Sequence, residues 1–96
     1  MVVEFVARHF HAPANLREYA EEEIKKFEKY HDKITQCQLI LNHEHHKHIA
    51  EINLSIPGNK IFAKSVSNNM TKSIDKAVLK ATQQLQKHLD LHYRHR

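Results

Sequence analysis

The chain has 96 residues and a formal net charge of +4, from 15 Lys and Arg against 11 Asp and Glu. A chain of this length buries about 60–65% of its unfolded surface, which excludes a multidomain enzyme with a deep substrate cavity. The composition, with 41% hydrophobic residues, one Gly and two Pro, is that of a folded domain. We therefore expect a single domain over residues 1–96 that functions through a flat surface.

The first half of the chain predicts a strand, a helix and a second strand. Apolar residues at alternate positions predict a strand over residues 2–8. Pro13 and the capping-box pair Asn15 and Glu18 place the start of a helix between Pro13 and Asn15. The apolar face of this helix repeats at steps of three and four and comprises Leu16, Tyr19, Ala20, Ile24, Phe27 and Tyr30. Alternating polarity predicts a second strand over residues 35–43.

The second half predicts two more strands and a long helix. Alternation from Ala50 to Ile56 predicts a third strand, which a polar hairpin loop joins to the second. Pro57-Gly58-Asn59 is a turn signal, and a fourth strand follows over residues 60–66. A cap among Ser67, Asn68 and Asn69 precedes the last helix. Its apolar stripe is Met70, Ile74, Ala77, Ala81, Leu85 and Leu89.

The element order is therefore β-α-β-β-β-α, in which the last three strands form an antiparallel meander. Each helix has one apolar face to bury, and a four-stranded sheet can cover both. We expect an α+β fold with two layers, in which the two helices pack side by side on one face of the sheet.

The positive charge is concentrated in the second half of the chain. Residues 1–52 carry seven basic and nine acidic side chains, whereas residues 53–96 carry eight basic and two acidic ones. On the last helix, lysines at steps of four, four and seven fall within one band about 80° wide. This lysine ridge consists of Lys72, Lys76, Lys80 and Lys87.

The first helix carries charges of both signs. Glu21 and Lys25, and likewise Glu22 and Lys26, have the i,i+4 spacing of intrahelical ion pairs. Three lysines near its end are expected to approach the lysine ridge and to form one cationic surface with it: Lys26, Lys29 and Lys33.

Lysines at helical spacing can neutralise successive phosphates and release their counterions, which gives affinity without base specificity. The sequence therefore predicts nucleic-acid binding. An ordinary solvated helix and an acidic protein partner are the alternatives.

Ten histidines are a second feature of the sequence. Four of them lie in the expected hairpin loop, in His43-Glu44-His45-His46-Lys47-His48, and His88, His92 and His95 repeat helical steps. Two or three imidazoles could bind zinc, but no cysteine or ordered ligand pattern completes a known site. The alternative is a polar loop that gains positive charge below pH ~6.5. We expect no metal and no other cofactor.

Neither catalysis nor membrane binding finds support in the sequence. The lone Cys37 lacks a CxxC partner and a nucleophile signature, so we expect a buried apolar residue. No carboxylate pair suits acid-base chemistry, so we expect no catalytic residues. Runs such as Leu39 to Leu41 are far shorter than the ~20 apolar residues of a membrane span, and the amino terminus lacks a secretory pattern. We expect a cytoplasmic protein without membrane contact.

Short motifs along the chain form a collinear pattern. They are Leu16-Arg17-Glu18, Lys26-Phe27-Glu28-Lys29-Tyr30, Pro57-Gly58, Ser73-Ile74-Asp75 and Gln84-Leu85-Gln86-Lys87-His88. Each is weak alone, but in this order they resemble the short ribosome hibernation-promoting factor family, also called ribosome-associated inhibitor or sigma-54 modulation proteins. The resemblance implies binding of the small ribosomal subunit and its ribosomal RNA in the decoding cleft, so that idle ribosomes cannot initiate. The contacts that it implies by position are Lys26, Lys29, Lys33, Lys76, Lys80, Lys87 and His88.

The sequence departs from the family pattern at two places. Asn69-Met70-Thr71 stands where the family usually has Asp-Met-Tyr, and Glu21-Glu22-Glu23 makes the first helix more acidic, which shifts the expected binding to the last helix. A general double-stranded-RNA-binding module, with a similar α-β-β-β-α core, is the alternative. A sigma-factor-binding protein, suggested by the older family name, is a third. We expect the free protein to be a monomer.

Overall fold

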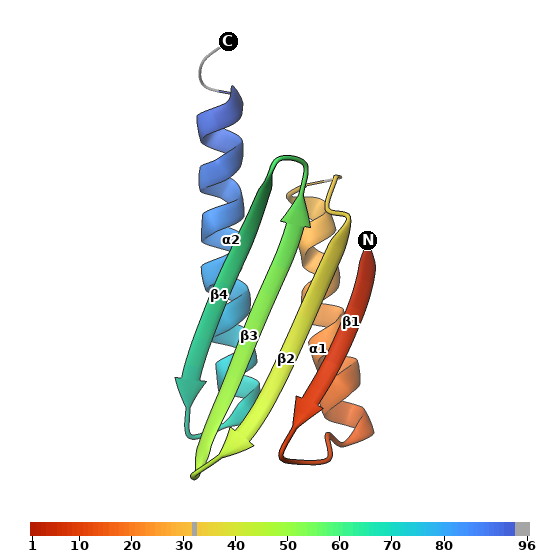
Figure 1. The fold of residues 1–96 in the computed structure, drawn as a ribbon, viewed down its shortest axis with the longest axis vertical. Helices are drawn as coiled ribbons and strands as arrows, with labels where there is room; N and C mark the ends of the chain where they lie inside the picture. The colour runs from red at the N-terminus through yellow and green to blue at the C-terminus, as the bar shows by residue number, and fades with distance from the viewer. Residues whose placement is uncertain (32, 94–96) are drawn as a thin grey trace.

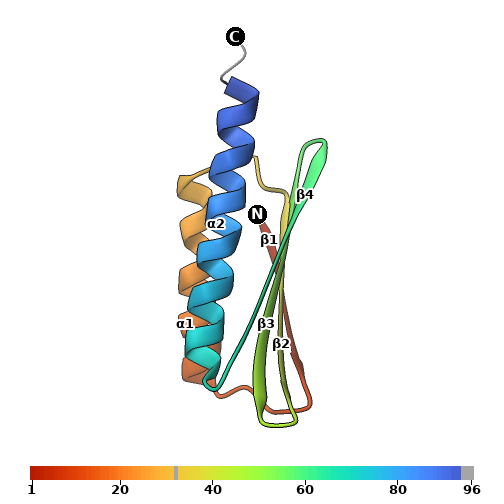
Figure 2. The ribbon, with the colours of Figure 1, turned by 90° about the vertical axis from the view of Figure 1, so that its left-hand side faces the viewer.

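The computed structural model describes residues 1–31 and 33–93, which form a sheet and two helices in two layers (Figures 1 and 2). The elements are β1 (Val2–Arg8), α1 (Ala14–Lys25) with a 3₁₀ extension η1 (Lys26–Lys29), β2 (Gln36–Glu44), β3 (Lys47–Ile56), β4 (Asn59–Ser67) and α2 (Met70–Tyr93). Figure 2 shows both helices on the same face of the sheet. The predicted α+β fold, β-α-β-β-β-α order and two-layer arrangement are confirmed.

The strands are arranged in the order β1-β2-β3-β4 (Figure 1). β2 pairs with β3 and β3 with β4 in antiparallel fashion, as the predicted meander requires. β1 pairs with β2 in parallel, with Val2 opposite Gln36 and Arg8 opposite Asn42. Because α1 carries the chain back along the sheet between β1 and β2, the two strands run in the same direction.

The core lies between the helices and one sheet face. On α1 and η1, Ala20, Ile24 and Phe27 are fully buried, whereas Tyr30 at the end of the predicted apolar face is 40% exposed. On α2 the predicted stripe is buried from Met70 through Leu85, and Leu89 is half-buried. Full burial of one large aliphatic side chain contributes about 1.5–3 kcal/mol, so the stripe residues fix which side of α2 faces solvent.

The two helices begin in different ways. α1 begins at Ala14, inside the predicted interval, but its N-cap is Pro13 and no side-chain hydrogen bond caps it. The predicted capping box of Asn15 and Glu18 is therefore wrong, because Asn15 already lies within the helix. α2 has the predicted cap, since the Asn69 side-chain oxygen accepts a hydrogen bond from the Lys72 backbone N–H at 3.1 Å.

The predicted polar loop around the histidines is largely absent from the described structure. β2 continues through Glu44, β3 starts at Lys47, and only His45 and His46 form the turn. Both turn residues have positive φ, 52° and 63°, as a two-residue type I′ hairpin requires. The continued pairing places His43 opposite His48, and their rings stack with centroids 4.0 Å apart.

Among residues 1–31 and 33–93, no helix combines the length and the hydrophobicity needed to cross a membrane.

Candidate nucleic-acid interface

The lysine ridge lies on the solvent side of α2. Lys72, Lys76, Lys80 and Lys87 are all exposed, and none of them forms an ion pair within the described part of the chain. A helix of 24 residues is about 36 Å long, so the ridge presents four ammonium groups along an extended rod. Charges that lack an internal partner are available to an external one.

One side of the lysine ridge contacts strand β4. The Lys80 Nζ donates a hydrogen bond to the Lys64 carbonyl at 2.9 Å, and the Gln84 Nε2 donates one to the Phe62 carbonyl at 2.7 Å. Because β4 is an edge strand, no further strand forms hydrogen bonds with these carbonyls, and the two side chains occupy them instead. Lys80 thus has a structural partner that Lys72, Lys76 and Lys87 do not have in the described residues.

The charges of α1 are paired with one another, but not in the predicted way. Arg17 pairs with Glu21 and Lys26 pairs with Glu23, each at 3.0 Å. The predicted pairs Glu21–Lys25 and Glu22–Lys26 are wrong. Glu21 instead pairs with Arg17, and Lys26 pairs with Glu23, because side chains three residues apart are also neighbours on a helix face. Lys29 and Lys33 are exposed.

A groove separates the lysine ridge from Lys26. It holds a cavity of about 270 Å³ lined by Glu23, Lys26, Tyr30, Asp75, Val78, Leu79 and Thr82. Two of these residues are carboxylates, and Leu79 is 57% exposed. The helices do lie side by side, but the expected single cationic surface is interrupted by this acidic and apolar strip.

A hydrogen bond across the groove fixes the two helices to each other. The Tyr19 hydroxyl donates to the Asp75 carboxylate, which joins α1 to α2. This bond to a charged acceptor, together with partial burial, raises the pKa of Tyr19 to about 12. This bond therefore links the helix that carries the lysine ridge directly to α1.

His88 occupies the opposite end of α2 from the Asn69 cap. Its Nδ1 lies 3.3 Å from the Asn59 side-chain nitrogen, and its ring lies 6.3 Å from that of His31. His88 is half-buried beside the β3–β4 turn. His88 therefore contacts the β3–β4 turn, whereas its sequence neighbour Lys87 is exposed.

The remaining candidate groups lack a reactive arrangement. Cys37 is fully buried as predicted, and burial raises the pKa of its thiol to about 12, so the reactive thiolate is disfavoured. Within the described residues, no group of three or more His, Cys, Asp or Glu side chains is placed to hold a metal. The His43 and His48 rings stack at an interplanar angle of 19°, so their nitrogens do not converge. His95 and the side chain of His92 lie outside the part of the chain that the structure describes.

Sequence comparison places the chain among known proteins. Residues 3–92 match the sequence model of the family described as Sigma 54 modulation protein / S30EA ribosomal protein. The chain belongs to this family. A ribosome hibernation promoting factor of Pseudomonas putida is 33% identical over 88 residues, which cover 92% of this chain and 86% of that protein. The factor of Escherichia coli K12 is 33% identical over 75 residues, which cover 78% and 79%.

The S30EA fold is also found in a solved structure. A ribosomal subunit interface protein from Coxiella burnetii has a TM-score of 0.86 and 26% identity, and the match covers 92% of this chain and 97% of that one. The family resemblance seen in the short motifs is therefore confirmed.

Sequence reasoning about this S30EA-family chain missed two exposed apolar side chains. Leu79 lies on the solvent side of α2 between Asp75 and the ridge, and Phe62 stands between Lys60 and Lys64 on the outer face of β4. Both could have been noticed as apolar residues at positions where the period of their element predicts polar ones.

Proposed function

We propose that this S30EA-family protein is a ribosome hibernation factor that binds the ribosomal RNA of the small subunit in the decoding cleft. The contacts come from the lysine ridge, Lys26, Lys29, Lys33 and His88. A chain bound there keeps an idle ribosome from initiating. The observation that carries the proposal is the exposed lysine ridge without internal ion pairs, in a chain whose relatives are named ribosome hibernation promoting factors. The protein acts as a cytoplasmic monomer, through one ribosome-binding domain, and without a catalytic step.

The distribution of charge explains how such a domain would orient on RNA. Ion pairs already occupy Glu21 and Glu23 of α1, whereas Lys72, Lys76 and Lys87 of α2 have no acidic partner in the part of the chain that the structure describes. Lysines without an acidic partner are the most effective at replacing the counterions condensed on phosphates. α2 therefore makes the main contact, and the end of α1 makes the second.

Cosedimentation with purified ribosomes through a sucrose cushion tests the proposal. The wild-type protein is expected in the ribosomal pellet at moderate salt, and the double variant Lys76→Glu/Lys87→Glu is expected to stay in the supernatant. Neither side chain touches the core, so the circular dichroism spectrum and the melting temperature should not change. The matched control is Lys25→Glu/Lys47→Glu, which changes the net charge equally at exposed positions outside the proposed contacts.

Two outcomes would contradict the proposal. If the α2 double variant pellets as the wild type does, the interface lies elsewhere. If a 16-bp RNA duplex competes as well as free small subunits do, the protein is a general double-stranded-RNA-binding module instead.

A further inference from the structure

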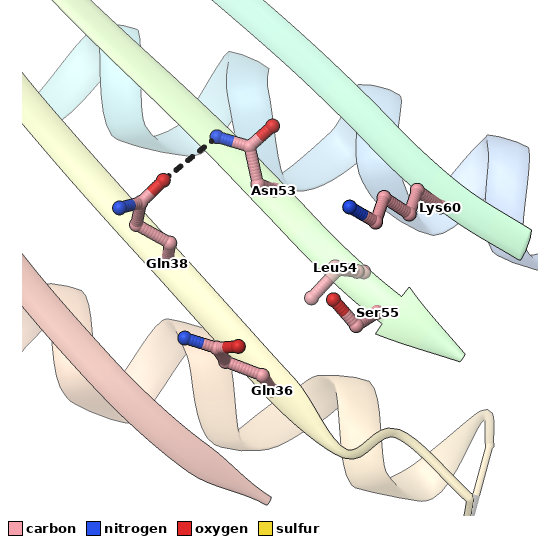
Figure 3. A pocket seen from close by; sticks show the side chains of 6 residues that line it. All are labelled: Gln36, Gln38, Asn53, Leu54, Ser55 and Lys60. Carbon is pink, nitrogen blue, oxygen red and sulfur yellow. Dashed lines mark hydrogen bonds between the residues drawn. The ribbon is translucent and has the colours of Figure 1, made fainter. Parts of the chain in front are cut away.

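The sheet face opposite the helices has its own hollow. Its volume is about 300 Å³, and it is lined by Gln36, Gln38, Asn53, Leu54, Ser55 and Lys60 (Figure 3). Strand alternation turns the polar side chains away from the core, because Cys37 and Leu39 on β2 and Ile52 on β3 are buried on the other side. Figure 3 shows the Lys60 side chain extending from β4 toward β3 over this hollow. The hollow is separate from the helix layer.

Hydrogen bonds hold the amides of this face in place. The Asn53 Nδ2 donates to the Gln38 Oε1 at 3.2 Å (Figure 3). The Gln38 Nε2 in turn donates to the Glu4 carboxylate at 2.5 Å, so the two bonds link β3, β2 and β1. Within the described residues, this arrangement leaves the Asn53 Oδ1, the Gln36 amide and the Lys60 ammonium without partners. The hollow is thus surrounded by the Asn53 acceptor, the Gln36 amide and the Lys60 cation, all open to an external ligand.

An exposed aromatic ring flanks the hollow. Phe62 lies opposite Asn53 in the β3–β4 register and is 51% exposed. Lys60 and Lys64 stand two residues before and after it on the same face of β4. Bases of single-stranded RNA stack on such rings on a sheet, while neighbouring cations bind the backbone and amides bind base edges.

The edge of β4 argues against a peptide that adds as a fifth strand there. Lys80 and Gln84 already donate to the Lys64 and Phe62 carbonyls, which such a strand would need. The sheet face, not this edge, is therefore the free surface. The net charge of the sheet face is small, because the Glu51 Oε1 lies 3.8 Å from the Lys64 Nζ and offsets its charge. Binding there would therefore depend on stacking more than on phosphate neutralisation.

We propose that the open sheet face binds a short segment of single-stranded RNA. One base stacks on Phe62, the edge of the base or of its neighbour reaches the amides of Asn53 and Gln36, and Lys60 binds a phosphate. This site lies on the opposite side of the sheet from the lysine ridge and does not depend on the proposed ribosome contact.

Fluorescence anisotropy of a labelled eight-nucleotide oligouridylate, titrated with the full chain, tests the site. Phe62→Ala is expected to weaken binding at least about fivefold, and Phe62→Tyr is expected to retain it. Lys60→Ala should lower the slope of log K against log salt by about 0.7, the value for one phosphate of a single strand. The matched control is Val66→Ala, because Val66 is 45% exposed on the same face of β4; its affinity should not change.

The helix-face variant separates this site from the proposed function. In the Lys76→Glu/Lys87→Glu background, Phe62→Ala should weaken oligouridylate binding by the same factor as in the wild type, because phosphate contacts of the lysine ridge contribute equally with and without the ring. Phe62→Ala alone should still pellet with ribosomes. The proposal is overturned if Phe62→Ala binds the oligonucleotide as tightly as the parent protein does, in the wild type or in the helix-face variant. It is also overturned if sedimentation equilibrium shows a dimer that Phe62→Ala dissociates, because the face would then be a contact between two copies.

Discussion

The two helices lie on the same face of one sheet, yet their charged residues have different surroundings. On α1 and η1, Arg17 and Lys26 are each 3.0 Å from a carboxylate of the same helical segment. On α2, Lys76 and Lys87 have no such carboxylate among the described residues. Exposed pairs contribute only about 0–1 kcal/mol to stability, so the α1 pairs mainly neutralise charge. Under the proposed function, the lysines without acidic neighbours, and not all exposed lysines alike, are therefore the ones expected to carry most of the RNA affinity.

The largest expected effect comes from removing single lysines on the two helices. Lys76→Ala and Lys87→Ala should each weaken ribosome binding on the order of tenfold and reduce the salt slope by about one. Lys26→Ala should change both by less than half as much, because Glu23 already neutralises Lys26. Filter binding to ribosomes between 50 and 300 mM salt measures both quantities. Equal losses for Lys26 and Lys76 would show that the ion pair on α1 opens on binding and that the contrast between the helices is not functional.

Much of the fold could be predicted from local sequence patterns. The spacing of apolar residues predicted the strands and helices and the exposed side of α2 with its lysine ridge, and a polar residue before the apolar stripe predicted the Asn69 cap. The histidine hairpin could not be predicted in this way, because His45 and His46 lack the Asn or Gly of a typical two-residue turn, and cross-strand pairing set the length of β2 and β3.

The candidate site was harder to predict than the fold, because its contacts join distant residues. Tyr19 and Asp75 are 56 positions apart, and Lys80 reaches a β4 carbonyl 16 positions away. Helical spacing makes both Glu22 and Glu23 neighbours of Lys26, at i,i+4 and i,i+3, and it does not decide between them; in the structure Lys26 pairs with Glu23. Spacing predicts which face a side chain occupies, but the tertiary structure decides its partner.

The second effect concerns the bond that holds the two helices together. Tyr19→Phe removes the hydrogen bond to Asp75 and should lower the free energy of unfolding by about 1 kcal/mol, since a bond to a charged acceptor is partly solvated here. The pKa of Tyr19 is about 12 in the folded protein, against 10.0 for an ordinary tyrosine. Because the folded value is the higher one, this stabilisation is complete below pH 10 and is lost as the pH rises toward 12.

Urea denaturation at pH 8 and at pH 11.5 measures this effect. The wild type and Tyr19→Phe should differ at pH 8 and converge at pH 11.5. A difference that is the same at both pH values would mean that the Tyr19 hydroxyl stabilises the protein through packing rather than through its proton. Tyr30→Phe is the control, because Tyr30 is exposed and lines the same groove.

The smallest effect is expected at the end of the molecule where the histidine hairpin meets the cap of α2. The Ser73 hydroxyl donates to the His48 carbonyl at 2.6 Å, the His43 ring stacks on that of His48, and the Phe10 ring lies edge-on to His43. Burial, and next the charge on His43, lower the pKa of His48 below the usual 6.5. The unfolded chain therefore binds this proton more readily than the folded one, so stability is complete above pH 6.5 and falls as the pH drops below it.

Replacing the imidazole with a ring that cannot be protonated isolates that contribution. His48→Phe should retain the stacking with His43 and should reduce the loss of melting temperature between pH 7.5 and pH 5.5 by a few degrees. The same change at His46, which is exposed at the turn, should leave the pH dependence as it is in the wild type. If both variants have the wild-type pH dependence, the titration of His48 does not contribute. The hairpin end would then differ from the Tyr19–Asp75 contact: ring stacking and the Ser73–His48 hydrogen bond would hold it, and no titrating proton there would change the stability of the protein.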